Sequence, residues 1–107
     1  MTILSYSLMG IKMDKEFYIK KSNIIKALAN PHRLMIIDCL LEGPKNVSEI
    51  VQITSQEQSY VSKSLSLLRK NGLVDDKKDG LNVYYSLKVC CMAQFFTCIN
   101  KMLKDSK

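Results

Sequence analysis

The sequence has a single histidine, His32, and no run that approaches 18 consecutive apolar residues. The lack of such a run excludes a membrane-spanning helix. The one histidine and the three cysteines of the last predicted helix fall in separate elements, and no activating motif surrounds any of them, so nothing resembles a nucleophile beside its base. Internal repeats and low-complexity segments are also lacking. A chain of 107 residues therefore makes one domain with one modest core, and an enzyme is the least favoured class.

The N-terminus lacks the features of a signal peptide. Its opening, MTILSYSLMGIKMDKE, is mildly apolar, but it has no positively charged first region and no convincing cleavage site. We therefore expect a cytoplasmic location. Met9 and Met13 leave open a downstream translation start, and we expect residues 1–14 to be loosely ordered before a domain that spans residues 15–104.

Acidic residues are outnumbered by basic ones, with 10 Asp and Glu against 16 Lys and Arg, for a net charge of +6. This balance favours a polyanionic partner, because neutralising phosphates releases condensed counterions. Charge alone is weak evidence, since many basic proteins bind no nucleic acid.

The stretch Asn46–Gly72 predicts two short helices joined by a tight polar turn. An apolar run from Val47 to Ile53 marks the first helix, with Asn46 or Ser48 as its N-cap. In the second helix the apolar residues recur at +4 and +3, which lines up one stripe: Val61, Leu65 and Leu68. Such a pair is a helix-turn-helix, whose second helix enters the major groove of DNA.

The polar face of the second helix has the composition of a DNA-reading surface. Opposite the apolar stripe, at about 100° per residue, lie hydroxyl and amine side chains and no carboxylate. The alternative is an amphipathic pair whose polar face is merely solvated. The residues that we predict to read or flank DNA bases are Gln58, Ser59, Tyr60, Ser62, Lys63 and Ser66.

From Leu73 the sequence predicts two strands instead of helix. LVDDKK and LNVYYSL flank Asp79-Gly80, a strong hairpin signal, and we expect Lys77 and Lys78 at the tip of this hairpin. A basic-tipped hairpin after a helix-turn-helix is a wing, which contacts the phosphate backbone while the helix reads bases. The predicted fold class is mainly α with a small β-hairpin, a winged helix-turn-helix.

Three segments, in this order, resemble the ArsR/SmtB family of small winged-helix repressors: IKALANPHRL, SQEQSYVSKSLSLLRKNGLV and DGLNVYYSL. The resemblance covers roughly residues 24–103. It implies a homodimer that binds double-stranded operator DNA and leaves it on binding a metal, a metalloid or a reactive sulfur species. The family's cysteine-rich motif at the start of the helix-turn-helix is absent, since Val47-Ser48-Glu49-Ile50 stands there.

Three more helices are predicted, at residues 15–30, 31–41 and 88–104. The first should bury Phe17, Ile24, Ile25 and Leu28, and the second, begun by Pro31, should bury Leu34, Ile37 and Leu41. The last helix carries two adjacent apolar stripes. A monomer this small seldom buries so wide an apolar face, so part of it should pack on a second copy of the chain. The predicted dimer interface, in the helix that the resemblance also assigns to dimerisation, is Phe95, Phe96, Ile99, Met102 and Leu103.

The cysteines are the candidate sensing residues. Cys39, Cys90, Cys91 and Cys98 lack the spacing of a zinc finger or of a secreted disulfide scaffold, so in a reducing cytoplasm they should be thiols. Cys91 and Cys98 share a face but are separated by about 10.5 Å of helix rise, too far to bind one ion. A site therefore needs Cys39 or a thiol of the other subunit. The alternative is that Cys39, Cys91 and Cys98 are small core residues.

Two sensing chemistries stay open. Two or three thiolates suit As(III) and other soft metal ions, and the Cys-Cys pair with a third cysteine resembles some arsenite-responsive members. The rival is a dithiol switch between Cys39 and a last-helix cysteine, as in the family's sulfide and redox sensors. The leading hypothesis is a repressor released by a thiol-directed inducer, with no obligatory cofactor. A winged-helix module for protein contact alone is a distant alternative.

Overall fold

The computed structural model describes residues 10, 12–88 and 90–105, with only the backbone given at residues 90 and 91. Most of the predicted N-terminal segment, residues 1–9 and 11, lies outside this part. The elements in chain order are α1 (Lys15–Leu28), α2 (Pro31–Leu41), α3 (Val47–Thr54), α4 (Gln58–Lys70), β1 (Val74–Asp79), β2 (Asn82–Leu87) and α5 (Cys90–Asp105). These bounds confirm the predicted winged helix-turn-helix. No helix among the described residues is long and apolar enough to cross a bilayer.

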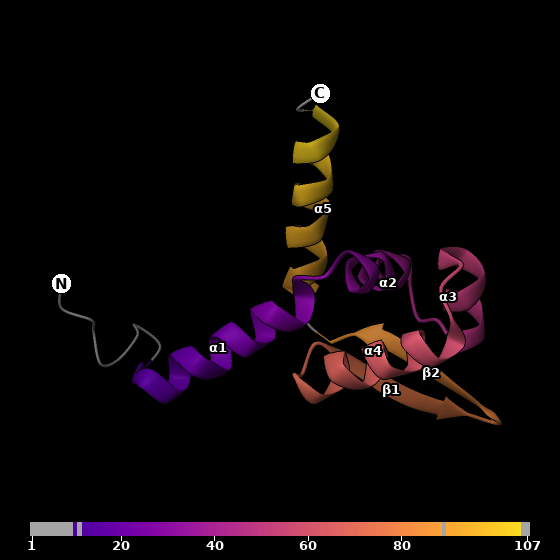
Figure 1. Cartoon of the computed structure of the whole chain (residues 1–107), viewed down its shortest axis with the longest axis horizontal. Coiled ribbons are helices and arrows are strands. Elements are labelled where there is room, and N and C mark those ends of the chain that lie inside the picture. The colour runs from indigo at the N-terminus through magenta and orange to yellow at the C-terminus, as the bar shows by residue number, and fades with distance from the viewer. Residues whose placement is uncertain (1–9, 11, 89, 106–107) are drawn as a thin grey trace.

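The elements divide into a body and two projections. The body consists of α2, α3, α4 and the hairpin, and α1 and α5 project from it in different directions (Figure 1). Helix α2 packs against α1, α3 and β2, whereas α5 packs against β2. Because α2 contacts these three elements, it relates the helix-turn-helix to the hairpin and to α1.

The junction between α1 and α2 is fixed by two polar side chains. Asn30, which we predicted to end the first helix, instead caps α2, since its Oδ1 accepts hydrogen bonds from the backbone N–H groups of His32 (3.0 Å) and Arg33 (3.1 Å). Arg33 in turn donates from Nε to the carbonyl of Ala27 at 2.6 Å and from Nη2 to that of Lys26 at 3.2 Å. The guanidinium thus satisfies the Ala27 carbonyl, which the end of α1 leaves open, and adds a second donor to the Lys26 carbonyl, which already accepts from Ala29 N–H.

The start and end of α3 are set by local signals. Asn46 is the N-cap, as one of the two predicted candidates, and it forms a capping box in which Asn46 and Glu49 each accept from the other's backbone N–H. Ser55 ends the helix in the left-handed region, at φ 59°. The turn into α4 is therefore short and polar.

The hairpin turn lies one residue later than predicted. Asp79 pairs with Asn82 in the antiparallel ladder, so the two turn residues are Gly80, at φ +65°, and Leu81. A positive φ at the first turn residue suits a glycine there. Lys77 and Lys78 pair with Tyr84 and Val83, so they lie along β1 and not at the tip, which corrects the prediction.

The core lies between α2, α3, α4 and the start of β1. In α2 the predicted positions were partly wrong, because the buried residues are Ile36, Ile37, Cys39 and Leu40 while Leu34 is exposed. A helix covered on several sides buries a wider face than one stripe. In α1 only Ala27 is buried, and Ile24 and Ile25 are exposed, contrary to the prediction.

Candidate nucleic-acid interface and sensing thiols

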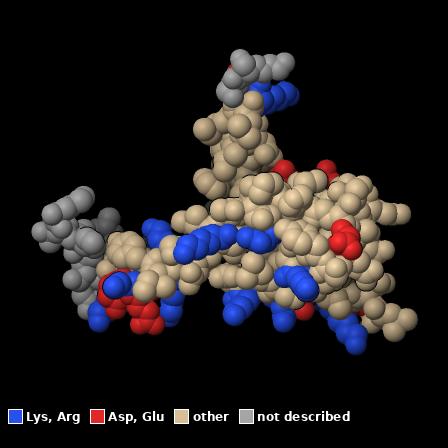
Figure 2. All heavy atoms as spheres, viewed as in Figure 1, with Lys and Arg blue, Asp and Glu red and all other residues tan. Residues whose placement is uncertain are grey.

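Helix α4 has one buried and one solvent-facing side. Val61, Leu65 and Leu68 are each 0% exposed, which confirms the predicted stripe and fixes the rotation of the helix about its axis. On the other side all the residues predicted to read or flank bases are exposed except Tyr60. The exposed residues are Gln58, Ser59, Ser62, Lys63 and Ser66. Lys and Arg side chains gather along the lower edge of the body, where α4 and the hairpin lie (Figure 2). The exposed side can donate hydrogen bonds and carries positive charge.

Tyr60 is directed toward α2 and is half-buried. Its hydroxyl donates to Asn30 Oδ1 at 3.0 Å, and its ring meets that of His32 edge-on at 5.7 Å. Asn30 Oδ1 therefore accepts three hydrogen bonds, two from the start of α2 and one from α4. Tyr60 thereby holds the first turn of the helix against α2, a positioning role that the sequence did not indicate.

The hairpin presents a mixed surface. Lys77 and Lys78 are exposed on β1. Arg69 at the end of α4 forms an exposed ion pair with Asp76 of β1, with Nη1 and Oδ1 3.3 Å apart. Leu81 at the tip is fully exposed. We placed it in the second strand from the sequence and so did not predict an apolar residue at the tip. The ion pair joins α4 to the hairpin.

The thiols fall in contrasting surroundings. Cys39 is 4% exposed in α2, and this burial is the main cause that raises the pKa of its thiol. The carboxylates of Glu42 and Asp38 raise that pKa further, against the opposing charge of Lys45. The position of Cys39 thus agrees with the alternative prediction that it is a small core residue.

Cys98 does not fit the alternative prediction of a small core residue, because the structure exposes it on α5. The side chains of Cys90 and Cys91 lie outside what the structure describes. Within the described part of the chain, no group of three or more His, Cys, Asp and Glu side chains could hold a metal ion. A site in this chain would need the first turn of α5 or a second subunit.

Comparison with known proteins decides the family. The model "Bacterial regulatory protein, arsR family" matches residues 30–76, which span α2, the helix-turn-helix and the start of β1. The transcriptional regulator NmtR of Mycobacterium tuberculosis is 37% identical over 82 residues, which cover 77% of this chain and 68% of that protein. This chain belongs to the ArsR family. It is accordingly a DNA-binding transcriptional regulator and not an enzyme.

Two solved structures show how far the likeness to other ArsR-family proteins extends. HlyU from Vibrio cholerae N16961 superposes with a TM-score of 0.73 at 30% identity, over 84% of this chain and 97% of that one. The winged helix-turn-helix domain of Mb0332 from Mycobacterium bovis, described as homodimeric, superposes with a TM-score of 0.75 at 27% identity, over 88% and 89%. The likeness therefore includes the projecting helices as well as the body.

This ArsR-family chain exposes apolar side chains on both projecting helices. Of the predicted interface, Phe95, Met102 and Leu103 are 58%, 67% and 70% exposed. Phe96 is buried in the chain's own core and Ile99 packs against that core, so these two serve the protomer itself. We predicted no exposed apolar face on α1, where Ile19 and Ile25 are exposed. The presence of apolar residues on more than one side of α1 could have indicated this face.

Proposed function

We propose that this protein is a homodimeric repressor that binds operator DNA in the cytoplasm. Helix α4 enters the major groove, and Lys77 and Lys78 of the hairpin contact phosphates. The observation that carries the proposal is the exposed side of α4, which holds hydroxyls, an amide and Lys63 but no carboxylate above a fully buried stripe. Such donors suit base edges and phosphate oxygens alike.

A second copy of the chain is the proposed cover for α1 and α5. Their exposed apolar residues are too many for a helix that faces only water, and a two-fold pairing would bury the same face twice. Such a dimer presents two copies of α4 to half-sites about one DNA turn, roughly 34 Å, apart. Tight operator binding then depends on the projecting helices.

Fluorescence anisotropy on labelled operator DNA at several salt concentrations tests the DNA-binding assignment. Lys63→Ala should relax base preference, whereas Lys78→Ala should weaken binding to all sequences alike and lower the salt slope by about one. Lys104→Ala at the far end of α5 is the matched control and should change neither. Unchanged affinity in a variant with Lys63, Lys77 and Lys78 all replaced by alanine would overturn the assignment.

We infer that the inducer acts on thiols and is most simply As(III) or another soft metal ion. The support is chemical: Cys98 is exposed and two further cysteines begin the same helix, while α5 offers no histidine and no carboxylate before Asp105. Cys98 lies too far along α5 from Cys91 to share an ion with it. A partner thiol would complete the set, and binding would release DNA if the ion prefers the unbound arrangement of the subunits.

A thiol redox or reactive-sulfur sensor is the second candidate. The buried Cys39 and the exposed Cys98 favour it, because an exposed thiol can react first and a buried thiol second, after local opening. Operator release by arsenite, Cd(II), Zn(II) and polysulfide, measured for each single Cys→Ser variant, separates the two. A soft-ion sensor loses its response without Cys91, and a dithiol switch loses it without Cys39. Wild-type responses in all four variants would contradict both.

A further inference from the structure

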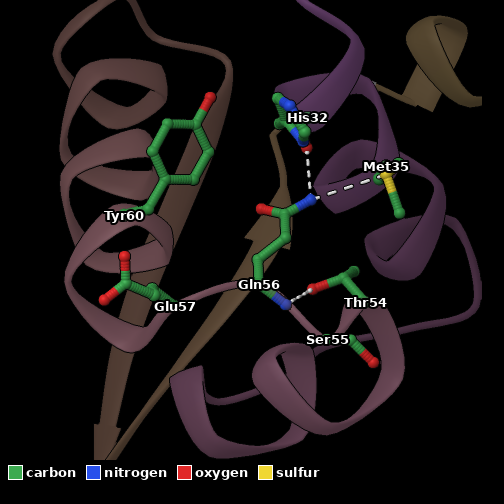
Figure 3. A pocket seen from close by; sticks show the side chains of 7 residues that line it. All are labelled: His32, Met35, Thr54, Ser55, Gln56, Glu57 and Tyr60. Carbon is green, nitrogen blue, oxygen red and sulfur yellow. Dashed lines mark hydrogen bonds between the residues drawn. The ribbon is translucent and has the colours of Figure 1, made fainter.

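An open hollow of about 380 Å³ lies at the surface between the start of α2, the α3–α4 turn and the first turn of α4. Figure 3 shows its lining from these three elements. None of the proposed thiol ligands belongs to it. The residues that line it are His32, Met35, Thr54, Ser55, Gln56, Glu57 and Tyr60.

Gln56 places an unsatisfied acceptor in the wall of this hollow. Its Nε2 donates to the carbonyl oxygen of His32 at 3.0 Å and lies 3.6 Å from the sulfur of Met35, which fixes the orientation of the amide. Oε1 consequently points to the side where Tyr60 and Glu57 lie (Figure 3). This oxygen is buried and has no hydrogen-bond partner in the described part of the chain. Leaving a buried acceptor without a donor costs about 1–3 kcal/mol, which a donor can recover.

The charge of the lining selects the donor. Glu57 precedes α4 as its N-cap residue but makes no capping hydrogen bond, so its carboxylate is available to a ligand. No lysine or arginine lines the hollow, although the protein carries a net charge of +6. A DNA phosphate would meet a carboxylate and an acceptor there, so the operator backbone is not the occupant.

Apart from the hydroxyl residues Thr54 and Ser55, the remaining walls are apolar or aromatic. The rings of His32 and Tyr60 stand edge-on to each other, and Tyr60 is held in place by its hydroxyl bond to Asn30. Met35 supplies a soft apolar surface beside them. An aromatic face near a carboxylate favours an organic cation over a hydrated inorganic one.

We propose that this hollow binds a small organic cation, an ammonium group carried on an apolar or aromatic body. The ammonium pairs with Glu57 and, once a small movement of the neighbouring side chains exposes Gln56 Oε1, donates to that oxygen, while the body lies against Tyr60 and Met35. The ligand would bridge α2 and the first turn of α4, so it would stabilise one setting of the reading helix. By linkage, operator DNA would then change the affinity for the cation by the factor by which the cation changes the affinity for DNA.

Three probes of one shape test the proposal: 2-phenylethylammonium, neutral 2-phenylethanol and anionic phenylacetate. Each is titrated into the free wild-type protein while amide ¹H–¹⁵N NMR shifts are recorded. The ammonium should bind with Kd on the order of 1 mM, a fair value for so small a ligand, with the largest shifts at Ser55–Tyr60. The alcohol should bind several-fold more weakly and the carboxylate least. Because no DNA is present, this result is independent of operator binding.

Variants assign the contacts. Glu57→Gln should weaken the ammonium by about threefold, the usual range for an exposed ion pair, and leave the alcohol unchanged. Gln56→Met should weaken both. Glu16→Gln, which removes a carboxylate from α1, is the matched control and should alter neither. Equal binding of all three probes, shifts centred elsewhere, no effect of Glu57→Gln or no ammonium binding at tens of mM would each overturn the proposal.

Discussion

The body that carries α4 and the two projecting helices solve the problem of a small core differently. In the body, Ile36, Ile37 and Ile50 are completely buried together with the stripe of α4. Among the described side chains of α1 and α5 only Ala27 and Phe96 are buried, although both helices carry several large apolar residues. Burial of apolar area is the main favourable contribution to folding, at about 25 cal/mol per Å². The body is therefore complete within one chain, whereas the projecting helices leave most of their apolar area for the proposed second chain to cover.

The same substitution in the two regions should show this contrast most strongly. Ile37→Ala should lower the free energy of unfolding by about 2–5 kcal/mol, because it leaves a cavity at a position with no exposed surface. Ile25→Ala, at a position 58% exposed in the single chain, should cost much less per protomer. Urea unfolding followed by circular dichroism measures both, and equal losses at low protein concentration would contradict the division.

A charge on α5 should separate dimerisation from folding. Phe95→Asp should abolish the dimer, since an unpaired charge buried in an interface costs about 3 kcal/mol or more, and operator affinity should fall on the order of a hundredfold. The helical content should persist, because Phe95 lies outside the chain's own core, unlike Phe96. Sedimentation velocity at micromolar concentration is the measurement.

Thr97→Asp is the control for that variant, since Thr97 is exposed about 200° around the helix from Phe95. It should remain dimeric and bind DNA as wild type does. A wild-type protein that sediments as a monomer, or a Phe95→Asp variant that stays dimeric, would refute the role given to this face.

The thiol of Cys39 should behave as part of the body. Its raised pKa means a smaller thiolate fraction at any given pH, so alkylation by iodoacetamide should show its inflection at higher pH than that of N-acetylcysteine. At pH 8 the rate should also be lower on the order of tenfold, as a local opening costing about 1.4 kcal/mol would give. Mass spectrometry of the labelled peptide follows it. Labelling as fast as N-acetylcysteine would show that α2 opens readily.

The smallest loss of stability is expected at the surface ion pair that joins α4 to β1. Asp76→Asn removes the ion pair with Arg69 and should cost less than about 1 kcal/mol, because both side chains are largely exposed. Asp75→Asn, the neighbouring carboxylate without an ion pair in the described residues, is the control. Thermal unfolding in low and in high salt compares the stability of the two variants. A loss of stability above about 1 kcal/mol for Asp76→Asn would mean that the ion pair sets the angle of the hairpin.

Local signals in the sequence predicted the parts of the fold that local chemistry determines. Pro31 marked the start of α2, Asn46 the cap of α3, and Val61, Leu65 and Leu68 the buried side of α4. Each signal acts within one or two turns of helix, so tertiary packing does not change it. The exposure of the base-reading side of α4 follows from the same periodicity.

The features that depend on packing were not predictable in this way. In α2 nearly every residue is apolar, so no stripe stands out, and only its central position decides that Ile36 and Leu40 are buried while Leu34 is not. The hairpin turn moved by one residue because Asp79 can pair in the ladder and leave Gly80 to adopt positive φ. The unsatisfied oxygen of Gln56 depends on a contact with His32, 24 residues away.

The backbone bridge between Lys45 and Tyr85 affects how the protein avoids unwanted assembly. Lys45 exchanges two hydrogen bonds with Tyr85, at 3.0 and 2.8 Å, so the segment before α3 covers the outer edge of β2 near its end. The outer edge of β1 has no strand beside it in the described chain, but it carries Asp75, Asp76, Lys77 and Lys78. A strand from another molecule would have to desolvate these charges to extend the sheet. The hairpin can therefore project into solvent, at the concentrations at which a regulator searches DNA, without becoming a template for aggregation.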